Sequence, residues 1–207
     1  MLLTARGPLF AQMPKKNIIL TGLILLILAS TVARNSIWLN DVTLYEETIR
    51  QNPRKSRAYN NLGRAYYLQG RQEDAKHMLE RALQHGPGNA EAMNNLAVVH
   101  LDLKAYDKAI AYALRALQIQ PGSADAHNTL GEVYMKLDEF DKALSHFRVS
   151  LSLGPSKPER YYNAAMALDR LGRQQESCGY LKNYLARVDA DAHVEDVIMH
   201  MQRMGCR

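Results

Sequence analysis

Amide side chains recur along the chain at a fixed spacing, and their chemistry suits the binding of a polypeptide. A carboxamide both donates and accepts hydrogen bonds, so a regular series of amides can hold the backbone of an extended peptide whatever its sequence. Helix interiors disfavour asparagine, which favours a binding role, and asparagines that only cap or solvate helices are the alternative. The series steps by 34 residues through Asn60 and Asn61, Asn94 and Asn95, Asn128 and Thr129, and Tyr162 and Asn163.

Residues that usually carry catalysis or bind metals form no working arrangement in this sequence. The seven histidines show no metal-binding spacing such as His-Glu-x-x-His, no glycine-rich phosphate loop occurs, and no serine lies in a nucleophile elbow. His100 and His127 fall at positions that hold helix-packing residues elsewhere in the chain. We therefore expect no enzymatic activity, no metal and no cofactor.

Composition and charge narrow the class of protein and its partners. Hydrophobic residues make up 47% of the 207 residues and charged residues 23%, an ordinary globular balance. The net charge of +5 is scattered, without a basic run interleaved with aromatics, so we expect no nucleic-acid partner. The two cysteines, Cys178 and Cys206, exclude a four-cysteine metal site; one disulfide and two unpaired thiols both stay open.

A repeat of 34 residues predicts the elements that position the amides. Tyr59, Leu62 and Tyr66 are spaced to form one face of a helix, and Ala75 and Leu79 one face of a second helix. No single helix pair can bury its apolar face alone, so the pairs are expected to stack into a solenoid. The prolines that end each second helix are Pro53, Pro87, Pro121 and Pro155, each 34 residues after the previous one.

Small and turn-forming residues complete the predicted pair. One column of the repeat is small throughout, which lets the second helix approach the first closely. Gly70 and Gly172 mark the turn between the two helices, where a helix end favours a left-handed residue. The small column consists of Gly63, Ala97, Gly131 and Ala165.

The repeat also predicts how the chain is divided. Leu44, Tyr45, Thr48 and Ile49 fall on the second-helix face of a repeat whose first helix is missing, so this half repeat is expected to cap the array. The predicted segments are an N-terminal tail at 1–16, a transmembrane helix at 17–35, the half-repeat cap at 36–55, repeats at 56–89, 90–123, 124–157 and 158–190, and a C-terminal capping helix at 191–207.

Two blocks resemble the tetratricopeptide repeat (TPR): YNNLGRAYYLQGRQEDAKHMLERALQHGP and HNTLGEVYMKLDEFDKALSHFRVSLSLGP. The resemblance implies an all-α fold, a TPR superhelix of helix-turn-helix units. It covers residues 56–190, and the fourth unit departs most, with Ala164, Leu168 and Ser177 in place of the usual Leu, Tyr and Ala. Such drift suits a terminal repeat.

The TPR resemblance places the amides in a concave groove where extended peptides lie. Asn61, Asn95 and Asn163 match the asparagine ladder of O-linked N-acetylglucosamine transferase, and Thr129 interrupts the match. A groove for chaperone carboxylate tails is disfavoured, because Asp125 and Thr129 stand where that subclass needs basic residues. The predicted peptide-binding residues are Arg57, Asn60, Asn61, Arg64, Asn94, Asn95, Asn128, Thr129, Tyr162 and Asn163.

An uncharged apolar run, IILTGLILLILASTVA at 18–33, predicts a membrane anchor; the alternative is a cleaved signal peptide. Lys15 and Lys16 precede the run, so the positive-inside tendency places the N-terminus in the cytoplasm. The predicted localisation is single-pass in the membrane through 17–35, with the repeats outside the cytoplasm, as in a bacterial inner membrane and periplasm.

The first hypothesis for the function is a membrane-anchored TPR module or scaffold that binds a protein segment. The stretch ARNSIWLNDVTLYEETIRQNPRKSRAYNNLGRAY resembles the junction in multi-pass membrane proteins of the transmembrane-and-TPR type, related to lipid-dependent sugar transferases. That resemblance implies a truncated or split relative with a multi-pass membrane partner. A third hypothesis is an assembly factor for a secretion, pilus or outer-membrane system.

Overall fold

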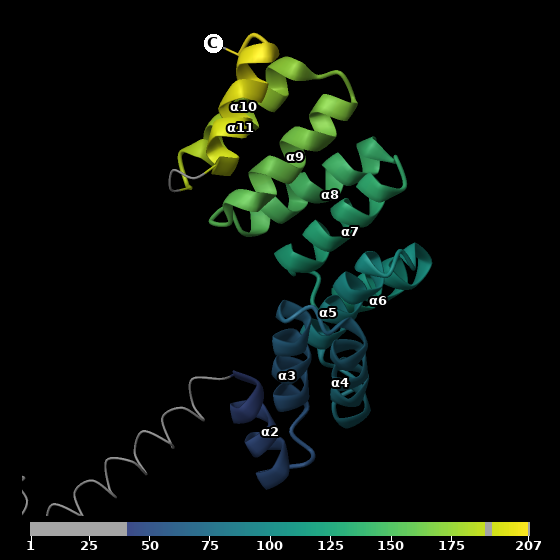
Figure 1. The fold of residues 1–207 in the computed structure, drawn as a ribbon. Coiled ribbons are helices and arrows are strands. Elements are labelled where there is room, and N and C mark those ends of the chain that lie inside the picture. The colour runs from purple at the N-terminus through teal and green to yellow at the C-terminus, as the bar shows by residue number, and fades with distance from the viewer. Residues whose placement is uncertain (1–40, 189–191, 207) are drawn as a thin grey trace, which may run out of the picture.

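The computed structural model describes residues 41–188 and 192–206, and within them the chain forms ten helices and no strand (Figure 1). The helices stack along one winding axis, from α2 at one end to α10 and α11 at the other. Their bounds are α2 Asp41–Gln51, α3 Ser56–Leu68, α4 Gln72–His85, α5 Ala90–Asp102, α6 Tyr106–Ile119, α7 Ala124–Lys136, α8 Phe140–Leu153, α9 Pro158–Arg170, α10 Gln174–Leu185 and α11 Ala192–Arg203.

Consecutive helices pack as pairs, each with a first helix (α3, α5, α7 or α9) and a second helix (α4, α6, α8 or α10). The small column of the repeat explains the close packing inside a pair. A methyl group added at Gly131 would lie 2.6 Å from Cδ1 of Phe147, and one added at Gly63 would lie 2.7 Å from Cγ of Leu79. Phe147 and Leu79 are fully buried, so the first helix has room for them only where it carries a small residue.

The turn inside each pair uses a left-handed residue, as the sequence predicts for Gly70 and Gly172, with φ of 75° and 73°. Lys104 and Asp138 occupy the same column of the repeat and also have positive φ, 58° each. The turn geometry is therefore kept in all four pairs, even where the residue is not glycine and the conformation is strained.

Each proline of the repeat follows the end of a helix by two residues. α2 ends at Gln51 before Pro53, and α4 ends at His85 before Pro87. Proline cannot donate to the helical hydrogen-bond ladder, so it separates one pair from the next. Two of the next helices begin with a side-chain cap: Asn89 and Ser123 accept hydrogen bonds from backbone N–H groups in the first turns of α5 and α7, whereas α3 and α9 have no such cap.

Helix α2 covers the apolar side of α3 that faces away from α5. Val42 is buried, and Tyr45 and Ile49 pack against the cluster that contains Tyr59 and Leu62. The hydroxyl of Tyr66 on α3 also donates to a carboxylate oxygen of Glu46 on α2, at 2.8 Å. In the described residues α2 thus stands where a preceding second helix would pack.

The C-terminal helix α11 closes the other end of the array (Figure 1). Val197 and Met201 are buried against α9 and α10, whereas Ile198 is 40% exposed because it points away from the contact. Cys178 on α10 and Cys206 form a disulfide, which resolves the alternatives left open by the sequence. The cap is therefore held by packing and by a covalent bond.

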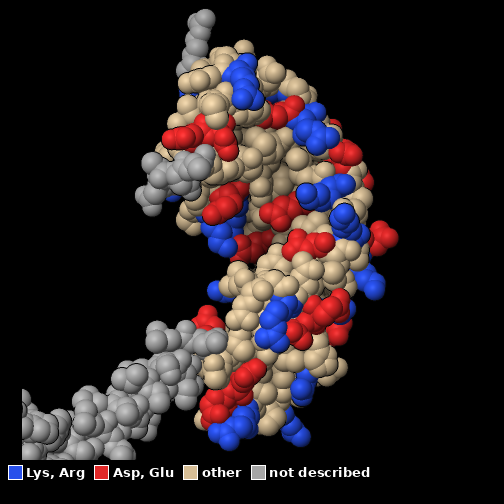
Figure 2. All heavy atoms as spheres, viewed as in Figure 1, with Lys and Arg blue, Asp and Glu red and all other residues tan. Residues whose placement is uncertain are grey.

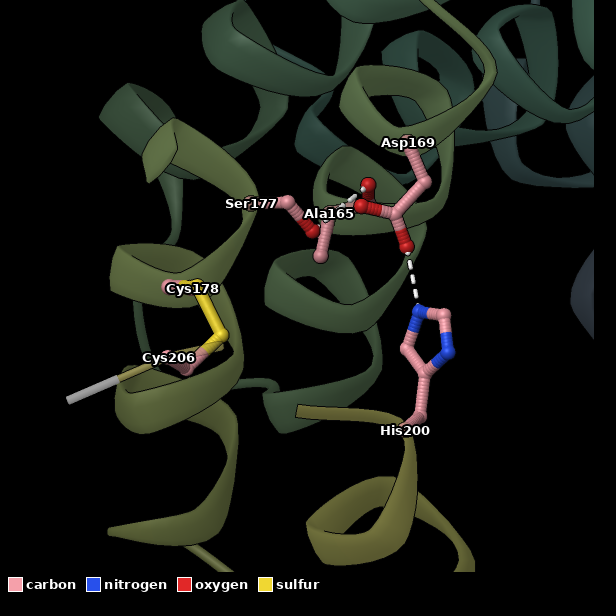
Figure 3. Close-up of a disulfide and its surroundings, with 6 residues drawn as sticks. All are labelled: Ala165, Asp169, Ser177, Cys178, His200 and Cys206. Carbon is pink, nitrogen blue, oxygen red and sulfur yellow. Dashed lines mark hydrogen bonds and ion pairs between the residues drawn. A yellow bond between two sulfur atoms is a disulfide. The ribbon is translucent and has the colours of Figure 1, made fainter. Parts of the chain in front are cut away.

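Two polar contacts complete the C-terminal end (Figure 3). His200 on α11 lies 2.6 Å from Oδ2 of Asp169 on α9, measured from Nε2. Ser177, which stands in the alanine column of the second helices, is fully buried, and its hydroxyl donates to the backbone oxygen of Ala165 at 3.1 Å. The hydroxyl that Ser177 adds to the fourth repeat, in place of alanine, therefore has the hydrogen-bond partner that a buried polar group requires.

The predicted membrane localisation needs correction. None of the helices within 41–188 and 192–206 is long and apolar enough to cross a bilayer, so this finding contradicts the prediction of a single-pass membrane protein with extracytoplasmic repeats. The segment 17–35, to which the prediction assigned the membrane helix, lies outside the described residues, as does the N-terminal tail at 1–16.

The contact between Gly131 and Phe147 predicts that a larger residue at position 131 destabilises the protein. We expect Gly131→Ala to lower the free energy of unfolding by about 1 kcal/mol, because overpacking a buried site costs about 1–3 kcal/mol and alanine recovers about 1 kcal/mol of helix propensity. Urea denaturation measures the change. In a Phe147→Ala background the same Gly131→Ala change is expected to be stabilising; a loss of stability in both backgrounds would show that the steric contact is not the cause.

The packing of α2 predicts that it stabilises the array. Tyr45→Asp is expected to lower the free energy of unfolding by about 1–3 kcal/mol, since it removes ring packing and places a charge against the α3 cluster. Tyr45→Phe keeps the ring and is the control, expected to unfold like the wild type. If Tyr45→Asp left the denaturation midpoint unchanged, α2 would not act as a cap.

Candidate peptide-binding groove

The first helices line a groove made of two adjoining hollows. The larger, of about 610 Å³, is lined by residues of α3, α5 and α7, together with residues of the turns that precede α7 and α9. The smaller, of about 510 Å³, is lined by residues of α5, α7 and α9, with contributions from α8 and the turn after α5. Glu132 on α7 borders both hollows, which makes them parts of one surface. Figure 2 shows acidic side chains gathered beside the hollowed middle of the molecule.

Asn94, Asn95, Asn128 and Asn163 border these hollows, but much of the hydrogen-bonding capacity of the predicted amides is used between repeats. Nδ2 of Asn95 on α5 donates to Oδ1 of Asn60 on α3 at 2.9 Å. Nδ2 of Asn163 on α9 donates to Oδ1 of Asn128 on α7 at 3.2 Å. The amides therefore form two pairs that join neighbouring repeats, and their side chains are held in fixed orientations.

Three of the predicted peptide-binding residues are buried, so they contribute mainly to the walls of the groove. Asn60 is fully buried, and Thr129 is 3% exposed with its hydroxyl donating to the backbone oxygen of Asp125 at 3.0 Å. Asn94 is 9% exposed, and its Oδ1 has no hydrogen-bond donor among the described residues. Thr129 and Asn94 still border the larger hollow.

The remaining predicted residues divide between the groove and its surroundings. Arg64 and Asn95 border the larger hollow, and Asn163 borders the smaller one. Tyr162 lies farther along, where its ring packs edge-on against His193 in a third hollow beside α11. Arg57, which is exposed at the start of α3, and Asn61 border none of these hollows, and Oδ1 of Asn61 accepts a hydrogen bond from Nδ2 of Asn60 at 3.4 Å.

Another column of the repeat borders the groove, and only its first residue, Arg64, is among the predicted binding residues. Val98, Glu132 and Met166 follow Arg64 at the same 34-residue step and border the hollows together with it. Their chemical types differ, so the sequence shows no common chemistry at this position. The fixed spacing from Arg64 is the signal that could have found them.

The carboxylate of Glu132 is the charged centre of the groove. Its Oε1 accepts hydrogen bonds from Nδ2 of Asn128 at 2.8 Å and from Nδ2 of Asn163 at 3.0 Å. Burial raises the pKa of Glu132, and the two amide hydrogen bonds only partly oppose this. Burial also raises the pKa of Tyr67, whose hydroxyl donates to Asp102 at 2.7 Å.

Asp125, by contrast, is neutralised by neighbouring cations. Nζ of Lys157 lies 2.8 Å and Nη2 of Arg160 lies 2.7 Å from its Oδ1. Burial alone raises the pKa of Asp125, but the hydrogen bonds from Lys157 and Arg160 outweigh burial and lower it. Asp125 thus joins α7 to α9, and its charge is used inside the protein.

Family models decide which kind of repeat builds this groove. Three models described as tetratricopeptide repeats match residues 56–89, 73–124 and 100–168. The chain carries tetratricopeptide repeats. The predicted all-α TPR solenoid is confirmed, and the TPR module is of the kind that binds peptide or protein partners.

Solved structures share the TPR fold. The chain is 25% identical to MamA over 70% of this chain and 85% of that chain, with a TM-score of 0.59. It is 21% identical to TTC0263, a thermophilic TPR protein in Thermus thermophilus, over 92% of this chain and 98% of that one, with a TM-score of 0.68. It is 19% identical to YrrB, a TPR protein with an unusual peptide-binding site, over 84% and 88% of the two chains, with a TM-score of 0.58.

No curated protein matches the chain. The resemblance to multi-pass membrane proteins also finds no support, since the family models match only the TPRs. Part of that predicted junction, residues 33–40, lies outside the described residues.

Buried and partly buried histidines on the TPR helices are expected to make the stability of the fold depend on pH. Nδ1 of His127 on α7 lies 3.1 Å from Nδ1 of His146 on α8, a contact that requires one ring to donate and the other to accept. Burial lowers the pKa of His127, of His146 and of His100. The nearby His127 adds to the effect on His146.

We expect the free energy of unfolding to fall as the pH drops from about 7 to about 5. The unfolded chain takes up protons near pH 6.5, whereas the buried histidines of the folded state stay neutral to lower pH. The stability is thus fully present above about pH 6.5 and is lost below it. His146→Phe, measured by urea denaturation across this range, is expected to lose less stability, and the exposed His77→Gln serves as control. Equal losses in His146→Phe and wild type would contradict the assignment.

Proposed function

We propose that this TPR chain is a non-catalytic module that binds an extended peptide segment of a partner protein in the groove of its first helices. The observation that carries the proposal is the continuity of the two hollows, which are bordered by amides held in fixed positions by hydrogen bonds between repeats. A groove that is already formed loses little conformational entropy when a peptide enters it.

The chemistry of the groove suits a polypeptide backbone. Asn60 is buried, but Asn95, Asn128 and Asn163 border the hollows and each keeps part of its donor or acceptor capacity, which is available for peptide N–H and C=O groups. YrrB, which shares the fold at 19% identity, is described as having an unusual peptide-binding site, and a peptide is proposed here as the ligand class alone.

Selection from a random library of 12-residue peptides displayed on phage, with the full chain as bait, tests the proposal. The recovered peptides are expected to bind at least about tenfold more weakly to a variant with Asn61, Asn95 and Asn163 changed to alanine, since each peptide hydrogen bond contributes about 0.5–1.5 kcal/mol. Fluorescence anisotropy measures the affinities. The matched control changes three exposed amides of the second helices, Gln84, Gln118 and Gln175, to alanine.

Loss of folding in the triple asparagine variant is checked by circular dichroism. Val98→Arg gives a second test, because it fills the larger hollow and leaves every amide in place. Peptides that bind all variants as tightly as the wild type, or a selection that recovers none, would overturn the proposed function.

A further inference from the structure

Acceptor oxygens at the meeting point of the two hollows lack cationic partners. Glu132 borders both hollows, Asp102 borders the smaller one, and neither forms an ion pair with a lysine or arginine among the residues that the structure describes. Lys104 and Lys136 also border the smaller hollow and are exposed, as is Asp102; the charge of Lys136 lowers the pKa of Glu132, but no ion pair joins the two side chains. This centre differs from Asp125, whose charge is already neutralised within the protein.

The two carboxylates are held in place by groups that cannot neutralise them. Oε1 of Glu132 accepts from the amides of Asn128 and Asn163, and Asp102 accepts from the hydroxyl of Tyr67. These donors are uncharged. Both carboxylates border the smaller hollow, and the negative charge of Asp102 adds to burial in raising the pKa of Glu132.

Asn94 provides a second, independent sign of a missing donor. Its side chain is nine-tenths buried, at 9% exposure, in the wall of the larger hollow, and its Oδ1 has no partner among the described residues. A buried acceptor without a donor is costly, and most such atoms in folded proteins are paired. This enclosed oxygen adds its partial negative charge to the wall of the groove, beside the carboxylates of Glu132 and Asp102, and the combined charge favours a cationic ligand.

Apolar side chains lie beside the carboxylates. Met135, Met166 and Leu101 border the smaller hollow together with Glu132 and Asp102. Methionine is flexible and adapts to ligands of varied shape. Lysine and arginine carry an aliphatic stem that packs on apolar surface while the charged head reaches a polar group.

We propose that the groove selects peptides with a lysine or arginine side chain, whose cationic head pairs with Glu132 and Asp102 and whose stem packs on Met135 and Met166. This inference rests on the proposed function, which it narrows to a basic peptide. Burial of a carboxylate is unfavourable without a cation, so a bound ammonium or guanidinium group supplies the ion pair that neither carboxylate forms among the described residues.

The same phage library tests this inference with two isosteric variants. Glu132→Gln removes the charge and keeps an acceptor for the amides of Asn128 and Asn163, and Asp141→Asn, on α8 outside both hollows, removes one charge as a control. The recovered peptides are expected to share a lysine or arginine, to bind Glu132→Gln about tenfold more weakly, and to bind Asp141→Asn like the wild type.

A synthetic peptide in which glutamine replaces the shared basic residue completes a double-mutant cycle. It is expected to bind the wild type about tenfold more weakly and to show no further loss with Glu132→Gln, because both changes remove the same interaction. Affinity for the basic peptide is also expected to fall with added salt.

The outcomes separate this inference from the proposed function. Peptides that depend on Asn95 and Asn163 but lack a basic residue, or that ignore Glu132→Gln, would overturn the basic-side-chain assignment and leave the peptide groove intact. A selection in which no peptide depends on the groove amides would overturn both.

Discussion

Every helix pair of this array depends on the close approach between a small residue of its first helix and a side chain of its second. Where the second helix carries a bulky residue, Phe147 or Leu79, the first carries glycine with no room for a methyl group. Where the first helix carries Ala97, the second offers Ala113 at the same step, and the divergent fourth pair places Leu181 against Ala165, so the first-helix residue is small in all four pairs. This complementarity sets the distance between the helices, and the groove on the first-helix face follows from how such pairs stack.

The groove surface is polar yet ordered, because its side chains bind one another across repeats. Asn60 with Asn95, and Asn128 with Asn163 and Glu132, form small networks in which each group restricts the next. Such networks cost stability when half satisfied, and the unpaired oxygen of Asn94 is one such cost. A protein tolerates unsatisfied groups of this kind most readily where a ligand completes them.

Much of the fold follows from spacing that is visible in the sequence, and less of the groove does. The 34-residue step predicts the helix pairs, the left-handed turns at Gly70 and Gly172 and the outer position of the amides, since each depends on local chemistry repeated in register. The pairing of amides 35 residues apart depends on the twist between repeats, which spacing alone does not express. Glu132 lay in a column of unlike residues, so its role emerged only from its three-dimensional neighbours.

The two ends of the described array are secured in different ways. At the C-terminal end the disulfide between Cys178 and Cys206 spans 28 residues and keeps α11 beside α10 even when their packing fluctuates. At the other end, α2 is held to α3 by apolar contacts and the hydroxyl of Tyr66. Repeat arrays open from their ends inward, because each unit contacts only its neighbours. Under oxidising conditions the array is therefore expected to unfold locally from the α2 end first. Amide hydrogen exchange should begin in α2 and spread toward the central helices, and α10 should exchange late.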